Sequence, residues 1–370
     1  MADAASIRFY GRLTQPSIPA LNGIRALAVI LLILFNLGFV TFEIGNVGVI
    51  VFFVLSGFLI TRLLLAERGR TGSIAVGRFY LRRALRLLPA FYVFWLCYVG
   101  IALALHRQDA WDQYLAALFY INDYYRWMHP APHIPMDHTW SLAVEEQFYL
   151  IWPWICVWCN CERRTLIRVL IATIASIWTG RIIYEFWFSA NHDVIYYSFH
   201  TRADSLAVGC LLAVAVSSGA GFKYLPVFVR YQWSPFLTLA ALAVSLWFRL
   251  RFGVAFEHTV GLIVWPLLSA VLMIQWVAFS GGRMWGWIDA EPLNTLGKWS
   301  YATYLWHWLV DYLLIQRFGY GSDLIRVPIA ILGSFALGGL SYYVVESRFL
   351  RLKSQLREST RVESPRTTRR

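Results

Sequence analysis

The chain has 370 residues, of which 58% are hydrophobic and only 15% are charged, and its formal net charge at pH 7 is +12. Apolar stretches of about twenty residues recur from Ile24 almost to the C-terminus, which excludes an ordinary water-soluble domain. The positive charge does not indicate nucleic-acid binding, because the basic residues are spread over alternate loops and do not gather on one soluble face.

The sequence predicts an all-α fold, a polytopic transmembrane bundle of about ten helices. Segment 1–22 is polar and lacks the apolar core and cleavage site of a removable signal peptide. We therefore expect a cytoplasmic N-terminal segment at 1–22, a transmembrane domain at 23–346 and a basic, disordered cytoplasmic tail at 347–370. The predicted spans are 24–42, 47–65, 87–105, 140–158, 166–188, 206–218, 235–248, 260–279, 299–315 and 327–345.

The placement of arginine predicts the orientation, because positive charge accumulates in cytoplasmic loops. The loops after the second and fourth spans and the tail are rich in arginine. The loop at 43–46 has no basic residue, and the long loop at 106–139 has only Arg107 and Arg126. We expect a multi-pass protein of the cytoplasmic membrane with both termini in the cytoplasm and with affinity for anionic lipid headgroups.

The first span carries Arg25 near its cytoplasmic end and Asn36 well inside. Eleven residues are close to three helical turns, so the two side chains share a face about 16 Å apart. The two residues are candidates for lining a path along which a substrate enters the membrane domain. A snorkelling arginine and an asparagine bonded to another helix would explain the same pattern.

Before the third span, FYLRRALRLLP places Arg82, Arg83 and Arg86 at three- and four-residue spacings. Three guanidinium groups on one face suit phosphate, which arginine binds bidentately, and could hold the charged head of a coenzyme at the membrane edge. A positive-inside loop is the plain alternative.

The fourth span opens with DHTWSLAVEEQFYLIWP, which puts two adjacent carboxylates into an apolar run. Acidic residues at such positions are costly and are read first as functional. Ser141, Glu145 and Tyr149 fall on one helical face, whereas Glu146 points about 100° away. Either carboxylate is a candidate for proton transfer, and structural ion pairing is the alternative. His138 and Trp140 stand at the start of the same segment as candidate substrate contacts.

Two later motifs add polar groups to apolar helices. HTRADSLAVG places Arg202 and Asp204 at the outer mouth of the sixth span, and LGKWSYATYLWH places His307 inside the ninth. A histidine in this position is a candidate base, because it titrates near neutral pH, although a structural histidine fits as well.

The chain has five cysteines, which imply no disulfide framework. Cys156, Cys159 and Cys161 cluster at the predicted cytoplasmic end of the fourth span, where thiols stay reduced. A fourth ligand cannot be assigned, so we expect no metal site.

Taken in order, PALNGIRALAVILLILFN, GVIVFFVLSGFLITRLL, FYLRRALRLLP, DHTWSLAVEEQFYLIWP, RADSLAVGCLLA and LGKWSYATYLWHWLV resemble the acyltransferase-3 family of integral-membrane O-acyltransferases. The resemblance covers nearly the whole chain and implies a stand-alone ten-helix enzyme. It implies acyl-coenzyme A as the co-substrate, with no tightly bound cofactor. The acyl group, often acetyl, would pass to a hydroxyl of a glycan, a glycolipid or a glycosylated small molecule.

The resemblance also implies residue roles. Arg25 matches the first-helix arginine of the family, Arg83 and Arg86 its paired arginines, Glu145 and Glu146 its acidic pair, and His307 its late histidine. Eleven positions after the arginine, where the family typically has a histidine base, this chain has Asn36. The family also often has an aspartate where this chain has Asn22, and an acidic residue where it has Ile50.

The replacement leaves two interpretations, because an asparagine cannot accept a proton near neutral pH. In the first, a working enzyme takes its base from His307, Glu145 or Glu146, and Asn36 orients a reactant. In the second, the chain is a non-catalytic or transporter-like relative that has lost the base.

Overall fold

The computed structural model describes residues 11–12, 15, 17–38, 42–104, 111–129, 136–188, 192–217, 225–318 and 323–352. These residues form helices and turns, as the sequence predicts, and they divide into two compact units. The expected tail is described only to Leu352, so the rest of that prediction lies outside the described residues.

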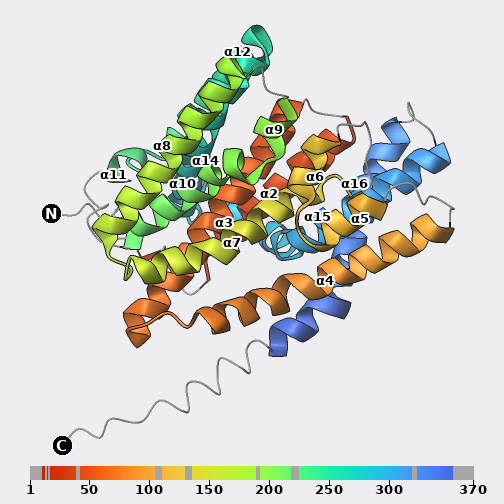
Figure 1. The fold of residues 1–370 in the computed structure, drawn as a ribbon, viewed down its shortest axis with the longest axis horizontal. Helices are drawn as coiled ribbons and strands as arrows, with labels where there is room; N and C mark the ends of the chain where they lie inside the picture. Colours follow the sequence, from red (N-terminus) through yellow and green to blue (C-terminus); the bar gives the residue numbers. More distant parts are fainter. Residues whose placement is uncertain are drawn as a thin grey trace, which may run out of the picture. The chain divides into compact units, whose positions relative to one another are not determined.

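The first unit comprises Met1–Ile74 and Ala110–Ser300. Its helices, shown in Figure 1, are α2 (Pro19–Asn36), α3 (Phe42–Thr71), α5 (Trp111–Leu118), α6 (Asn122–Met128), α7 (Thr139–Trp158), α8 (Arg163–Trp187), α9 (His192–Tyr197), α10 (Phe199–Ser217), α11 (Leu225–Phe228), α12 (Ser234–Phe252), α13 (Val254–Phe256), the π-helix η2 (Glu257–Gly261), α14 (Leu262–Phe279), the 3-10 helix η3 (Gly286–Asp289) and the beginning of α15 (Glu291–Phe318).

The second unit comprises Ala75–Asp109 and Tyr301–Arg370. Its helices are α4 (Val76–Ala104), the remainder of α15, α16 (Asp323–Ser341) and the π-helix η4 (Tyr342–Glu346). Tyr301 Oη donates a 3.1 Å hydrogen bond to the carbonyl of Leu87 on α4. Phe94 and Trp306 meet edge to face at 5.6 Å, so apolar and polar contacts both join α4 to α15.

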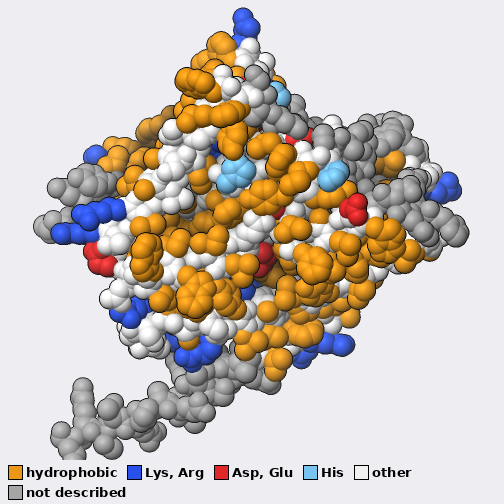
Figure 2. Space-filling model, viewed as in Figure 1, with side chains coloured by type: hydrophobic (Ala, Val, Ile, Leu, Met, Phe, Trp, Pro, Cys, Tyr) orange, Lys and Arg blue, Asp and Glu red, His pale blue; other side chains and the backbone are white. Residues whose placement is uncertain are grey.

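Eight helical segments among the described residues are long and apolar enough to cross a membrane. They confirm a polytopic helical membrane protein. The two other predicted spans correspond to α7 and α15, which are helices of 20 and 28 residues. Both carry ionisable side chains, such as Glu145, Glu146 and His307, that lower their apolar character. Figure 2 shows hydrophobic side chains spread over the visible face, as a lipid-facing surface requires.

An extensive and close helix crossing in the first unit joins α3 to α10, which lie side by side in Figure 1. A Cβ atom at Gly57 would come within 2.0 Å of the Leu206 carbonyl oxygen, and one at Gly209 within 1.9 Å of the Val54 oxygen. Only glycine fits at these two positions. Small residues commonly permit such close helix packing in membranes.

The predicted long loop at 106–139 is partly helical, because α5 and α6 form within it. Asn122 is buried and its amide donates to the Met136 carbonyl at 3.1 Å and to Thr139 Oγ1 at 2.8 Å. These bonds tie α6 to the start of α7 and so position His138 and Trp140.

Candidate functional site

The acidic part of α7 contacts α3. Ser56 Oγ donates a 2.7 Å hydrogen bond to Glu145 Oε1. Ser141 and Tyr149, predicted to share a face with Glu145, are buried, and Glu145 and Glu146 are half-buried. The Ser56 hydroxyl therefore fixes one carboxylate of the acidic pair in the interior of the first unit.

Three aromatic side chains, Phe53, Trp140 and Tyr196, surround the side chain of Arg202 on α10. We call these four residues the arginine box. The guanidinium carbon lies 6.0, 5.7 and 5.1 Å from the three ring centroids, within cation–π range. The Arg202 side chain has no exposed surface, and Trp140 and Tyr196 are 5% and 8% exposed. Two residues from the predicted site, Arg202 and Trp140, thus lie together.

In the part of the chain that the structure describes, the guanidinium of Arg202 has one hydrogen bond, in which Nη2 donates to Asn46 Oδ1 at 2.7 Å. Its Nε and Nη1 atoms have no hydrogen-bond partner among the described residues. A buried charged donor normally has its hydrogen bonds satisfied, because leaving one unsatisfied is costly. Within the described residues, Nε and Nη1 are therefore unsatisfied donors in the interior of the arginine box.

A chain of buried polar groups continues from Asn46 away from the box. Asn46 Nδ2 donates to Glu257 Oε1 at 2.9 Å, and Arg249 Nε lies 2.5 Å from Glu257 Oε2. Asn46 and Glu257 are 0% and 1% exposed. The chain holds Asn46 in one orientation, so its amide oxygen faces the arginine.

Asp204 does not share the partner of Arg202, which lies two positions earlier in the sequence. Its Oδ2 accepts 2.8 Å and 2.9 Å hydrogen bonds from Arg181 Nη2 and Trp178 Nε1 of α8. Arg181 also donates to the carbonyls of Thr201 and Leu262, and both members of the Arg181–Asp204 pair are buried. The predicted substrate contact at Asp204 is thus a buried ion pair that joins α8 to α10.

A second carboxylate is buried beside α7. Asp123 of α6 accepts hydrogen bonds from Gln147 Nε2 at 2.9 Å and from the Phe199 amide at 3.2 Å. Burial raises the pKa of Asp123 to about 6, although these hydrogen bonds oppose the shift. Gln147 follows the acidic pair in the sequence, and its side chain ties α7 to α6 through Asp123.

Arg25 and Asn36 both lie on α2, and both are half-buried. Asn36 is the last residue of that helix, directly before a turn at Leu37 and Gly38. His138 is buried at the N-cap of α7, where its carbonyl accepts a 3.3 Å hydrogen bond from Ser141 Oγ. Asn22, in the first turns of α2, donates to Asn294 Oδ1 at 2.7 Å.

In the second unit, Arg82, Arg83 and Arg86 form a half-buried cluster on α4, which we call the arginine fork. The Arg83 guanidinium lies 5.9 Å from the Phe79 ring centroid. Arg86 is an electrostatic neighbour of Glu346, a 4% exposed carboxylate on η4. The charge of a carboxylate beside the fork would lower the positive potential of the fork.

His307 of α15 is 2% exposed, and its Nδ1 is hydrogen-bonded to the Tyr304 carbonyl one turn earlier. Because a carbonyl only accepts, this bond places a proton on Nδ1, so Nε2 carries the lone pair whenever the ring is neutral. In its neutral form the ring could accept a proton at Nε2 alone.

The predicted site residues are distributed over both units. The first holds Arg25, Asn36, the acidic pair, the start of α7 and the arginine box, and the second holds the arginine fork and His307. Sequence reasoning did not select Asn46, Arg181 or Glu257, although ionisable groups in apolar helices were a signal for the last two.

Comparisons with known proteins agree on one family. The family model for the acyltransferase 3 domain matches residues 18–343. A peptidoglycan O-acetyltransferase of Listeria monocytogenes is 29% identical over 360 residues, which cover 91% of this chain and 56% of the relative. A candidate peptidoglycan O-acetyltransferase of Bacillus subtilis is 30% identical over 352 residues, 89% of this chain and 54% of the relative. The chain thus spans about half the length of these curated relatives, and no solved structure matches it significantly.

Proposed function

Because this chain belongs to the acyltransferase 3 family, we propose that it is an integral-membrane O-acyltransferase. It transfers an acyl group, in the first instance acetyl, from acyl-coenzyme A to a hydroxyl of a glycan, a glycolipid or a glycosylated small molecule. The names of its relatives make peptidoglycan the first acceptor to test. The protein acts in the cytoplasmic membrane with both termini in the cytoplasm, in keeping with its arginine-rich loops.

The observation that carries the proposal is the arginine box. In acyl transfer, the acceptor oxygen forms a bond to the thioester carbonyl carbon, the C–S bond breaks, and negative charge develops on the carbonyl oxygen in between. A buried cation with unsatisfied N–H groups stabilises such charge strongly, because the site excludes water. Arg202 offers Nε and Nη1 for that oxygen, with Trp140 beside it.

Proton transfer is assigned to the carboxylates and the late histidine. The acceptor hydroxyl loses its proton as it attacks, and the departing coenzyme A sulfur gains one, so one group can act first as base and then as acid. Glu145, Glu146 and His307 are the candidates. Asn36 orients the hydroxyl or the thioester carbonyl through its amide.

The arginine fork and Arg25 are assigned to the donor. Phosphate groups of coenzyme A are bound bidentately by arginine, and several half-buried guanidinium groups would hold the charged end of the donor at the membrane edge. His138, Ser141, Tyr149 and Asp204 complete the proposed acceptor site, Asp204 through its effect on the position of α10.

The proposal is tested by acetyl transfer from acetyl-coenzyme A to peptidoglycan glycan fragments in membranes containing the full chain. Arg202→Lys keeps the charge but loses the planar donor geometry, so we expect kcat to fall by about 10²- to 10³-fold. Arg251→Lys is the matched control, since Arg251 also lies 6.0 Å from an aromatic ring, that of Phe252, but is exposed. Equal activity of the two variants would refute the role of the arginine box.

The second candidate function, a non-catalytic relative, is favoured by one observation, the asparagine at position 36. The variant Asn36→His separates the two. If the wild type is inactive and the variant transfers acetyl groups, the chain has lost its base. If the wild type is active and the variant gains nothing, the base lies elsewhere, as we propose.

A further inference from the structure

Two histidines and a glutamate from three separate elements of the first unit converge at one point. Glu185 lies in the last turn of α8, His192 begins α9, and His258 is in the π-helix η2. One potential ligand atom from each residue lies within 4.8 Å of the other two. None of the three residues belongs to the acyl-transfer site proposed above.

The geometry of the cluster is close to that of a coordination site. His258 Nδ1 and Glu185 Oε2 are 2.7 Å apart, and the rings of His192 and His258 have centroids 5.2 Å apart at 46°. A tetrahedral metal at about 2.0–2.1 Å from each ligand atom holds those atoms roughly 3.3 Å apart. The 2.7 Å contact must therefore open slightly, and the His192 ring must move toward the other two ligands. The π-helix turns His258 toward α8, and such helical irregularities are frequent at functional sites.

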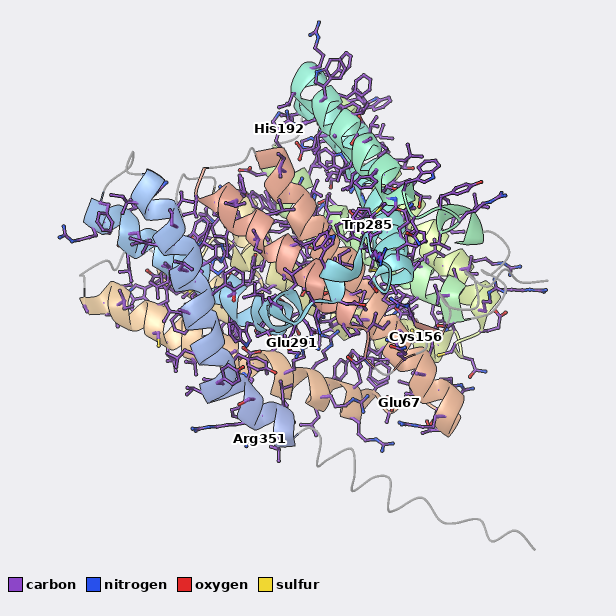
Figure 3. All side chains as sticks on the ribbon, turned by 180° about the vertical axis from the view of Figure 1, so that it is seen from behind. Glu67, Cys156, His192, Trp285, Glu291 and Arg351 are labelled. Atoms are coloured by element: carbon purple, nitrogen blue, oxygen red, sulfur yellow. The ribbon has the colours of Figure 1, made fainter. Side chains whose placement is uncertain are left out.

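The burial of the three residues gives the cluster a closed side and an open side. The side chains of His258 and Glu185 are 2% and 11% exposed, whereas His192 is exposed. Figure 3 shows His192 at the opposite end of the first unit from Glu67 and Cys156. An ion could thus enter past His192, and solvent could supply a further ligand.

Neighbouring charges do not compete for the carboxylate. Glu257, adjacent to His258 in the chain, is bound by Arg249 and Asn46 and is therefore already neutralised. No Lys or Arg ion pair with Glu185 is found among the described residues, where its hydrogen-bond partner is His258.

We propose that Glu185, His192 and His258 bind a divalent transition metal ion of the zinc type. Two imidazoles and one carboxylate, with a fourth position left to water, are a common zinc ligand set. Imidazole also favours zinc over magnesium and calcium, which prefer oxygen ligands. The ion joins α8, α9 and η2 at the end of the first unit remote from Glu67 and does not depend on the proposed acyl transfer.

The test uses the full chain in detergent, stripped with a chelator and titrated with Co²⁺, whose visible absorption reports tetrahedral coordination. We expect one Co²⁺ per chain, displaced by Zn²⁺ but not by Mg²⁺. His192→Ala should weaken Zn²⁺ binding by at least about 100-fold, more than the typical effect of losing an outer-shell partner. Because His192 is exposed, this variant is expected to keep the fold, which a thermal unfolding curve without metal verifies.

His129→Ala is the matched control, since His129 is also exposed but lies outside the cluster, stacked on Tyr125 at 4.3 Å. It should bind metal as the wild type does. Equal Zn²⁺ affinity of the wild type and His192→Ala, or no saturable Co²⁺ spectrum in the wild type, would overturn the proposal and leave a His258–Glu185 hydrogen bond of purely structural role.

Discussion

Ser56 of α3 donates a 2.7 Å hydrogen bond to Glu145 of α7, so the serine of the SGFL motif holds one carboxylate of the acidic pair. A hydrogen bond to a charged group contributes about 1.5–3 kcal/mol, and it also fixes the direction of the accepting oxygen. Two motifs that are far apart in the sequence therefore act as one structural element.

Because Ser56 and Glu145 are in contact, we expect the effects of substituting them to be non-additive. We expect Ser56→Ala and Glu145→Gln each to reduce stability and acyl transfer, and the double variant to lose less than the sum. The coupling should lie at about 0.5–3 kcal/mol in thermal unfolding. Ser73→Ala, at an exposed position, is the control and should couple with nothing. Additive losses in the double variant would show that the contact is not formed.

The buried pair of Arg181 and Asp204 predicts an asymmetry between single and double substitutions. Removing one partner leaves the other charge buried and unpaired, so Arg181→Met or Asp204→Leu should cost about 3–5 kcal/mol in thermal unfolding. The double variant should recover much of this loss, because no uncompensated charge remains. Lys298→Ala breaks the exposed Lys298–Glu291 pair and should change the midpoint little. A double variant as unstable as the singles would contradict the argument.

The α3–α10 crossing predicts opposite effects of the same substitution at two glycines. Gly209→Ala places a Cβ within 1.9 Å of the Val54 carbonyl oxygen, so the helices must separate and unfolding should occur at lower temperature. Gly180→Ala, inside α8, has no described atom within 4 Å of its Cβ. It should stabilise the protein by about 0.5–1 kcal/mol through helix propensity. Equal shifts of the two midpoints would contradict the close crossing.

Asp123 predicts a pH dependence of stability. Its pKa is raised by burial from 3.8 to about 6, so between these values the folded protein binds more protons than the unfolded chain. Stability should therefore fall as the pH rises from about 4 to 6, by about 3 kcal/mol from this group. Asp123→Asn should flatten the curve, and Asp112→Asn, at an exposed position on α5, should leave it unchanged. Wild-type and Asp123→Asn curves of equal slope would contradict the assignment.

Hydropathy predicted the helical membrane fold, because an apolar stretch of about twenty residues crosses lipid as a helix that satisfies its own backbone groups. Hydropathy and charge placement could not predict which side chains form hydrogen bonds with one another. Arg202 and Asp204 were predicted together, yet Arg202 bonds Asn46, 156 positions away, and Asp204 bonds Arg181, 23 positions away. Such pairs depend on which helices cross, and that depends on glycine contacts that a single sequence does not reveal.

If the arginine fork binds the donor, substitutions in the fork should weaken the binding of coenzyme A. If Arg86 binds a phosphate of coenzyme A, Arg86→Ala removes a charge-assisted hydrogen bond of about 1.5–3 kcal/mol, which corresponds to about 10- to 100-fold weaker binding. Arg78→Ala, on the same helix but exposed, is the matched control and should bind as the wild type does. Isothermal titration of the purified protein with coenzyme A measures both. The wild-type affinity should also fall with salt, since phosphate contacts are electrostatic. Equal affinities of Arg86→Ala and Arg78→Ala would remove Arg86 from the donor site.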